Sequence, residues 1–174
     1  MRAAGILAEV FSARYLAVYL QDHLAGATGG LELARRAAGS NEGTPLGDFL
    51  ERLAAEIEED RETLREIMEG LGVGEDRIKV AFGWTAEKVG RLKPNGQLTG
   101  YSPLSRLVEL EGLHVGISGK LSGFQSLRTT FGEEVAGRNV DGLISRARHQ
   151  LEELEEHRLE AARVAFEDET TRVA

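Results

Sequence analysis

The chain has 174 residues, a net charge of −8 and no cysteine, and its apolar and charged contents of 41% and 29% are ordinary for a globular protein. The acidic balance argues against nucleic acid or an anionic membrane surface as the main partner. The lack of cysteine excludes disulfides, thiolate metal ligands and cysteine nucleophiles. No stretch approaches the roughly 20 apolar residues that span a bilayer, and Glu9 interrupts the N-terminus before a signal peptide could form, so we expect a cytoplasmic protein.

The first predicted helix covers residues 8–38, where apolar side chains recur at the spacing of one helix face. His23 lies on that apolar face, so its imidazole is expected to point into the core. Tyr19 precedes it by one turn, which places the phenol ring where it can stack on the imidazole or hydrogen bond to it.

A second helix is predicted to begin after Thr44, an N-cap followed by proline at the first helical position, and to extend to residue 71. Its long apolar stripe is interrupted halfway by Asp60 and Arg61, and Glu56 lies one turn earlier. These are the polar side chains closest to the buried face, so they are candidates for a polar site inside the protein.

About thirty residues separate this helix from the next one, which is too many for a tight hairpin and indicates a crossover along the protein. Residues 76–93 within it are predicted to be helical, and they include the only tryptophan, Trp84. We therefore expect a long crossover that carries a short extra helix.

The chain is organised around a helix over residues 102–127, which begins with Ser102 as N-cap and a proline after it. One face of this helix is apolar, and glycines recur on another flank at Gly112, Gly116, Gly119 and Gly123. Each glycine costs roughly 1 kcal/mol relative to alanine, so the stripe predicts that another backbone packs closely against it. The polar residues of such an enclosed helix are informative, and they are Glu109, Glu111, His114 and Lys120.

The last predicted helix covers residues 140–166, with Arg158 inside its apolar face and with Gln150 and His157 along its edge. Residues 128–139 before it are predicted to be a loop or a frayed helix end. Four long helices with one long crossover are typical of a ferritin-like four-helix bundle, which we assign to residues 1–166 as one all-α domain. Residues 167–174 are predicted to be a disordered tail.

Each helix brings polar groups to its buried side near mid-length, which indicates one shared cluster at the centre of the bundle. As a metal site, this cluster offers imidazole and carboxylate ligands suited to iron, zinc, copper or manganese. The candidate ligands are His23, Asp60, Glu111, His114 and His157. Glu111 and His114 match the Glu-x-x-His pattern of di-iron bundles, whereas the other helices depart from the ligand set that a di-iron site requires.

The alternative is a buried ion network without a metal, in which two arginines pair with carboxylates and histidines bridge them. Its candidate members are Glu56, Asp60, Arg61, Glu111 and Arg158. A guanidinium repels a divalent cation by several kcal/mol at a few Å in a medium of intermediate dielectric, so central arginines favour this network over a metal. Buried charge of this kind adds little stability, but it can fix which helices pair.

Four segments carry a resemblance: YLQDHLAG in the first helix, AEIEED in the second, GYSPLSRLVELEGL continued by GISGK in the third, and EEHRLEAAR in the fourth. On these segments the chain resembles an uncharacterised group of bacterial proteins within the ferritin-like superfamily. That superfamily includes ferritins, rubrerythrins and carboxylate oxidases. The resemblance therefore implies a helical bundle of the bacterial cytoplasm, a dimer or larger oligomer, and iron or oxidative-stress chemistry as a candidate activity.

We expect a non-catalytic bundle that acts by association with itself or with a protein partner, through the glycine stripe of the third long helix. The alternative is a metal-binding or redox bundle that uses the five candidate ligands. Binding of a small ligand in the bundle core is a third hypothesis, and it requires a cavity. No arrangement of serine, histidine and acid predicts nucleophilic catalysis.

Overall fold

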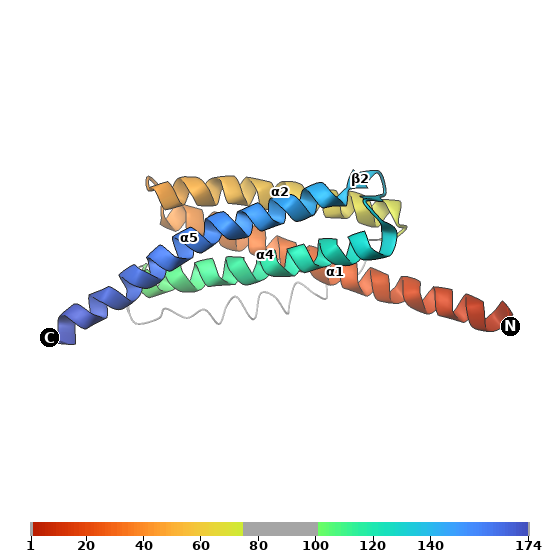
Figure 1. Ribbon diagram of the computed structural model, residues 1–174, viewed down its shortest axis with the longest axis horizontal. Helices are drawn as coiled ribbons and strands as arrows, with labels where there is room; N and C mark the ends of the chain where they lie inside the picture. The colour runs from red at the N-terminus through yellow and green to blue at the C-terminus, as the bar shows by residue number, and fades with distance from the viewer. Residues whose placement is uncertain (1, 75–100, 174) are drawn as a thin grey trace.

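The computed structural model describes residues 2–74 and 101–173, and the surroundings of side chains between residues 13 and 74 and between residues 101 and 167. Four long helices make up most of these ranges: α1 (Arg2–Ser40), α2 (Pro45–Gly70), α4 (Pro103–Phe131) and α5 (Val140–Val173) (Figure 1). The prediction of an all-α protein is confirmed. The short helix predicted for residues 76–93 lies outside the described residues.

The helices form two antiparallel hairpins that pack side by side. α1 packs along α2 and along α4, and α4 packs along α5. In Figure 1, α2 ends at one end of the bundle and α4 begins at the other, so these two helices run in the same direction. Each hairpin buries one stripe of its helices against the other hairpin, which gives the bundle a shared interior.

Two helix starts follow the caps that the sequence predicts. The hydroxyl of Thr44 accepts a hydrogen bond from the Gly47 amide (3.1 Å), and Pro45 follows it. The hydroxyl of Ser102 does the same for the Ser105 amide (3.0 Å), again with proline at the next position. Each cap satisfies an amide that has no partner within the helix, so both starts are set by local chemistry.

A small β-hairpin joins α4 to α5, where the sequence predicts only a loop or a frayed end. Its strands are β1 (Glu134–Val135) and β2 (Arg138–Asn139), paired in antiparallel register. The turn residues Ala136 and Gly137 have φ of 50° and 74°, and positive φ at both central residues is typical of tight hairpin turns. Strands of two residues leave no alternating pattern, so sequence periodicity cannot detect them.

The apolar core has two parts, with polar residues between them. One part contains Ile57 of α2 and Ile117 of α4, and the other contains Leu64 of α2 and Phe124 of α4. Asp60 and Lys120 fall between these pairs along their helices. The interior is therefore two apolar clusters separated by a polar layer, and that layer is the place to look for a site.

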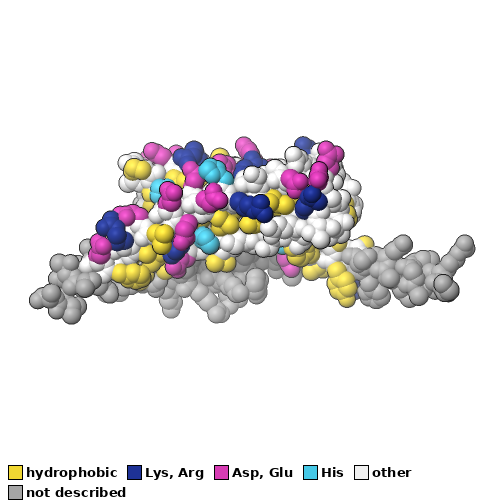
Figure 2. Space-filling view, viewed as in Figure 1, with side chains coloured by type: hydrophobic (Ala, Val, Ile, Leu, Met, Phe, Trp, Pro, Cys, Tyr) yellow, Lys and Arg dark blue, Asp and Glu magenta, His cyan; other side chains and the backbone are white. Residues whose placement is uncertain are grey.

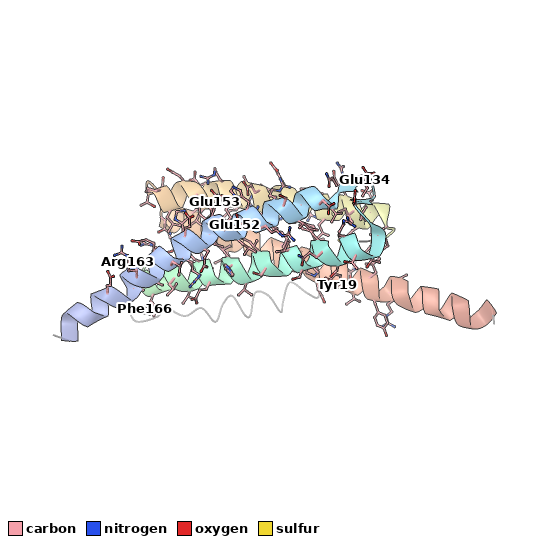
Figure 3. All side chains as sticks on the ribbon, in the orientation of Figure 1. Tyr19, Glu134, Glu152, Glu153, Arg163 and Phe166 are labelled. Carbon is pink, nitrogen blue, oxygen red and sulfur yellow. The ribbon has the colours of Figure 1, made fainter. Side chains whose placement is uncertain are left out.

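The outer faces of the bundle are charged. Acidic and basic side chains are interspersed over the face formed by α2 and α5 (Figure 2), where Arg52 pairs with Glu153 at 3.2 Å. Figure 3 labels Glu152 and Glu153 on α5, of which Glu152 is exposed and Glu153 is half-buried. Exposed pairs of this kind contribute roughly 0–1 kcal/mol each, so they do not determine the fold.

The first and the last helix of the chain, α1 and α5, are both longer than the sequence predicts. α1 begins at Arg2, and its N-terminal part extends beyond the bundle (Figure 1). α5 continues to Val173, where the sequence predicts a disordered tail from residue 167; the segment contains neither glycine nor proline to end the helix. None of the helices in the described ranges combines the length and the apolarity needed to cross a membrane.

Candidate functional site

Asp60 of α2 lies at the centre of the polar layer, with a side chain that is 1% exposed. Lys120 of α4 donates a hydrogen bond from Nζ to Asp60 Oδ2 at 2.5 Å. Arg146 of α5 places Nη2 2.5 Å from Asp60 Oδ1, an ion pair rather than an aligned hydrogen bond. Both carboxylate oxygens of Asp60 therefore have a cationic partner, and each partner comes from a different helix.

An amide and a second carboxylate complete this layer. Lys120 Nζ also donates to Gln150 Oε1 at 2.5 Å, and Gln150 Nε2 donates to Glu56 Oε2 at 2.7 Å. Arg146 Nη1 donates to Glu59 at the surface (2.8 Å). We call these six residues the central network: Glu56, Glu59, Asp60, Lys120, Arg146 and Gln150.

Burial lowers the pKa of Lys120 from its ordinary value, because desolvation of the ammonium outweighs the attraction of Asp60. The nearby Arg146 guanidinium lowers it further, and Glu56 opposes this effect. Asp60 is the main group that opposes this loss of charge, through its hydrogen bond and its attraction. The network is thus a set of mutually dependent charges, in which the loss of one partner leaves another buried without compensation.

The predicted histidine ligands do not converge. They have separate neighbours: His23 stacks edge-on against Tyr19 and His157 stacks against Phe49, both with ring centroids 4.5 Å apart, and His114 Nε2 lies 3.8 Å from Glu155 Oε2. The stacking of Tyr19 on His23 agrees with their spacing of one helix turn. Within residues 2–74 and 101–173, no three His, Asp or Glu residues are grouped closely enough to hold a metal ion.

The two arginines that the sequence predicts to pair with Asp60, Glu111 or Glu56 have other hydrogen-bond partners. Arg61 donates from Nη2 to its neighbour Glu62 at 3.0 Å, and Arg158 makes two hydrogen bonds of 2.7 Å to Glu155. Arg158 also lies 3.8 Å from Glu111, which is exposed. Of the residues predicted for a buried network, only Glu56 and Asp60 take part in the central one. Long arginine side chains reach from an apolar stripe to the surface, so their place on a helix face does not fix where the charge lies.

The sequence analysis does not identify Arg146 as a site residue, and it names Lys120 without assigning it to the polar cluster. Lys120 is recognisable as a polar residue on an enclosed helix, and Gln150 lies at the edge of the apolar face of α5. Arg146 precedes Gln150 by one helix turn, so the pair shares a face, which is the signal that was available. Nothing in the sequence indicates that α4 and α5 both turn this face toward Asp60.

A second polar cluster, which the sequence does not predict, ties α1 to the start of α4. It consists of Arg36, Asn41, Tyr101, Arg106 and Glu109. Tyr101 donates its hydroxyl to Glu109 (2.9 Å) and accepts from Asn41 (3.0 Å). Arg36 donates from Nε to Glu109 at 3.1 Å, and Arg106 donates from Nε to Asn41 Oδ1 at 2.9 Å. Burial, more than the neighbouring Glu109, raises the pKa of Tyr101 to about 12.

No backbone from residues 2–74 or from the other described helices lies against the glycine stripe of α4. A Cβ atom at Gly112 would lie 3.1 Å from a Leu33 methyl, and one at Gly123 would lie 2.9 Å from the His23 ring. At Gly116 and Gly119 it would meet no described atom within 4 Å. Among the described residues, two of these glycines therefore face side chains of α1 and two have no neighbour, and the predicted close backbone contact stays a prediction.

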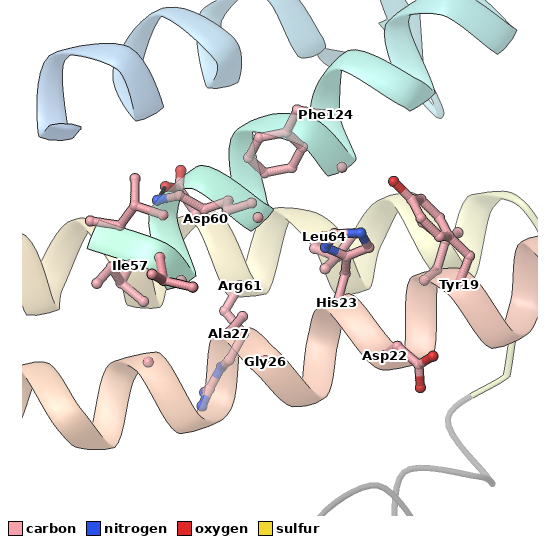
Figure 4. Close-up of a pocket in the computed structure, with 18 of the residues that line it drawn as sticks. Tyr19, Asp22, His23, Gly26, Ala27, Ile57, Asp60, Arg61, Leu64 and Phe124 are labelled. Carbon is pink, nitrogen blue, oxygen red and sulfur yellow. Dashed lines mark hydrogen bonds and ion pairs between the residues drawn. The ribbon is translucent and has the colours of Figure 1, made fainter. Parts of the chain in front are cut away.

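The open space is a pocket of about 420 Å³ between α1, α2 and α4 (Figure 4). Gly26 and Gly30 of α1 and Gly116 and Gly119 of α4 line it, and Lys120 and Asp60 form part of its inner wall. Leucine, isoleucine and phenylalanine side chains supply most of the rest. A volume of this size is in the range of small-molecule sites, which are largely apolar with a few polar groups.

No family model, curated protein or solved structure matches the chain. Three features of the geometry therefore define the class of protein: the helix order, the central network and the pocket.

Proposed function

We propose that this protein is a non-catalytic bundle of ferritin-like architecture, in which the central network lies where other bundles of that architecture hold a di-iron centre, and that it acts by association. The two antiparallel hairpins, with α2 and α4 in the same direction, support the architecture. The observation that carries the proposal is the pairing of both Lys120 and Arg146 with Asp60.

The network replaces ligands with cations. A di-iron site in this architecture takes carboxylates and imidazoles from all four helices. Here α4 and α5 supply Lys120, Arg146 and Gln150 at the layer where α2 supplies its carboxylates. A divalent ion beside an ammonium and a guanidinium is repelled by several kcal/mol at an intermediate dielectric. This arrangement favours a structural role over metal-dependent chemistry.

We propose a second copy of the chain as the partner. On α1, Tyr15 and Val18 are 70% and 42% exposed, and they follow the part of the helix that extends beyond the bundle (Figure 1). Large apolar side chains gathered on one exposed helix face are typical of protein contacts. The resemblance implies an oligomer in the bacterial cytoplasm. Both expectations are consistent with this proposal, and both remain predictions.

Sedimentation equilibrium tests the association. We expect a dimer at micromolar concentration, and we expect the double variant Tyr15→Ser with Val18→Ser to be a monomer with unchanged helix content. The control is Leu159→Ser on α5, which removes an apolar side chain of similar exposure (55%) from another surface and should leave the dimer intact. A monomeric wild-type protein contradicts the proposal.

Elemental analysis tests the role of the network. Protein purified without chelator should contain less than about 0.1 equivalents of iron, zinc, copper or manganese per chain, because Lys120 and Arg146 repel a divalent ion at this layer. The metal-binding or redox alternative, which uses His23, Asp60, Glu111, His114 and His157, requires stoichiometric metal instead. One or two equivalents per chain would replace the proposal with that alternative.

A further inference from the structure

We propose that the pocket between α1, α2 and α4 binds a small, planar aromatic molecule that carries one acidic group. The pocket lies within a single chain, and its Tyr19 end is one helix turn from Tyr15 of the α1 surface proposed for self-association. Three features of the pocket carry the inference: its bare helix walls, its aromatic end and an incompletely used guanidinium.

Two facing parts of the wall, on α1 and on α4, are helix backbone at glycine positions. At Gly26 and Gly30 on α1 and at Gly116 and Gly119 on α4, no atom of the described residues lies within 4 Å of the position that a Cβ atom would take. Glycine inside a helix costs roughly 1 kcal/mol relative to alanine, and no close backbone packing offsets that cost in the described structure. The glycines instead keep a flat-sided space open, and a planar ring fits such a space better than a branched chain.

One end of the pocket is aromatic. Tyr19 and His23 stack edge-on, the Tyr19 hydroxyl donates to Ser126 on α4 (3.0 Å), and Phe124 lies opposite on α4. The hydrogen bond to α4 holds the phenol ring in place. Burial lowers the pKa of His23, with Asp22 opposing that effect, and this favours the uncharged ring. Ring edges and faces arranged in this way bind a further aromatic ring.

The acidic group is inferred from Arg61. Its side chain is 16% exposed, and it reaches from α2 toward Gly26 and Ala27 of α1 (Figure 4). Its Nε is buried and has no hydrogen-bond partner in the described part of the chain. Its Nη2 donates to Glu62, a carboxylate that Arg65 also uses.

The other charged groups of the lining do not favour a different ligand. Lys120 already uses two of its three donors on Asp60 and Gln150, and its charge is balanced by Asp60. Asp22 lies toward Tyr19, away from Arg61 (Figure 4), and would repel a second acid. A guanidinium with free donors recognises a planar carboxylate or sulfonate through paired hydrogen bonds. The lining therefore matches one acidic group at the Arg61 end and an uncharged aromatic body.

Two fluorescent probes test the inference. 8-Anilinonaphthalene-1-sulfonate has the expected shape and acid, and N-phenyl-1-naphthylamine is the same ring system without the sulfonate. Wild-type protein should bind the sulfonate probe at one equivalent per chain and the neutral probe about tenfold more weakly. Arg61→Gln should weaken the sulfonate probe about tenfold and leave the neutral probe unchanged.

A matched pair of glycine variants locates the site. Gly30→Leu fills the pocket from α1 and should abolish binding of both probes. Gly39→Leu makes the same change on the same helix, also with open space around it but outside the lining, and should bind like wild type. Circular dichroism melting should show both variants folded, because leucine is a better helix former than glycine.

Each other outcome overturns a stated part of the inference. No saturable binding of either probe, or unchanged binding in Gly30→Leu, removes the site. Equal affinity for the two probes, or a sulfonate affinity that Arg61→Gln leaves unchanged, removes the acidic group. Binding at several equivalents per chain in wild type and variants alike means that only adventitious surface binding occurs.

Discussion

Asp60 has almost no contact with solvent, and its two oxygens face cations from two other helices. Its replacement by a neutral amide leaves Lys120 and Arg146 close together and without their shared counter-charge. Removal of one partner from a buried ion pair costs about 3–5 kcal/mol, whereas removal of an exposed one costs about 0–1 kcal/mol. In this protein, a buried and an exposed ion pair can be compared at two neighbouring residues of α2, Asp60 and Glu59.

Asp60→Asn is predicted to lower the free energy of unfolding by about 3–5 kcal/mol in denaturant titrations. The control is Glu59→Gln, which removes a 68% exposed carboxylate that also binds Arg146, and it should cost less than about 1 kcal/mol. Similar small losses in both variants would mean that Asp60 is hydrated and not the centre of a network.

Tyr101 gives a prediction for alkaline pH. Its pKa in the folded chain is raised to about 12 from 10.0, mainly by burial. Between these two values the unfolded chain loses the phenol proton while the folded chain keeps it, so the free energy of unfolding falls as pH rises through that window. Below pH 10 this contribution is constant.

Tyr101→Phe should remove the part of the alkaline decline that Tyr101 causes, although loss of its hydrogen bonds to Asn41 and Glu109 lowers stability at all pH values. Denaturant titrations at several pH values give the two slopes. Absorbance titration of the folded protein should show one tyrosine that ionises near pH 12 in wild type and is missing from the variant. Parallel slopes for the two proteins would contradict the raised pKa.

At the scale of whole elements, the glycines of α4 differ in what they face. Gly123 lies against the His23 ring of α1, which is itself held by Tyr19, whereas Gly116 faces the open pocket. Substitution by alanine should therefore have opposite effects on stability at Gly116 and at Gly123, which lie two helix turns apart. Helix propensity favours alanine at both positions by about 1 kcal/mol, and only steric overlap can reverse the sign.

Gly116→Ala is predicted to raise the melting temperature, and Gly123→Ala is predicted to lower it, with a loss of about 1–3 kcal/mol from overpacking against His23. The double variant His23→Ala with Gly123→Ala should lose less than the sum of the two single variants, because the added methyl then has room. Additive losses would show that α1 does not pack on α4 through this contact.

The sequence predicts the elements better than their contacts. The starts of α2 and α4 follow from Thr44 and Ser102, because a cap and a proline act on neighbouring residues alone. The end of α1 also follows from local turn formers. The hairpin at Ala136 is missed, since its two-residue strands depend on packing against the end of α2, where an added Cβ at Gly70 would collide with the Ala136 side chain.

At the scale of the whole molecule, the sequence predicts a polar layer at mid-bundle and assigns it the wrong cations. Periodicity places Asp60 on the buried stripe of α2, and the structure buries it there. Periodicity cannot say which helix faces that stripe, and it gives a long side chain such as Arg61 no direction. The pocket is beyond sequence reasoning for a similar reason: glycines at helical spacing are compatible with close packing or with open space.

The layer also bears on which helices pair. Asp60 requires the faces of α4 and α5 that carry Lys120 and Arg146, so any other rotation or register of these helices leaves a buried charge without a partner. A charged layer of this kind favours one arrangement of the four helices at little gain in stability. The central claim is that this ion pairing, and not a metal ion, occupies the middle of the bundle.

The most direct test is a proton–nitrogen correlation spectrum of the lysine ammonium groups, with Lys120 assigned by the variant Lys120→Arg. We predict a Lys120 signal protected from exchange with water, absent in Asp60→Asn, and unchanged by stoichiometric Zn²⁺ or Fe²⁺. A Lys120 ammonium that exchanges freely with water in the wild-type protein, or one whose signal moves as one equivalent of metal binds, would contradict the claim.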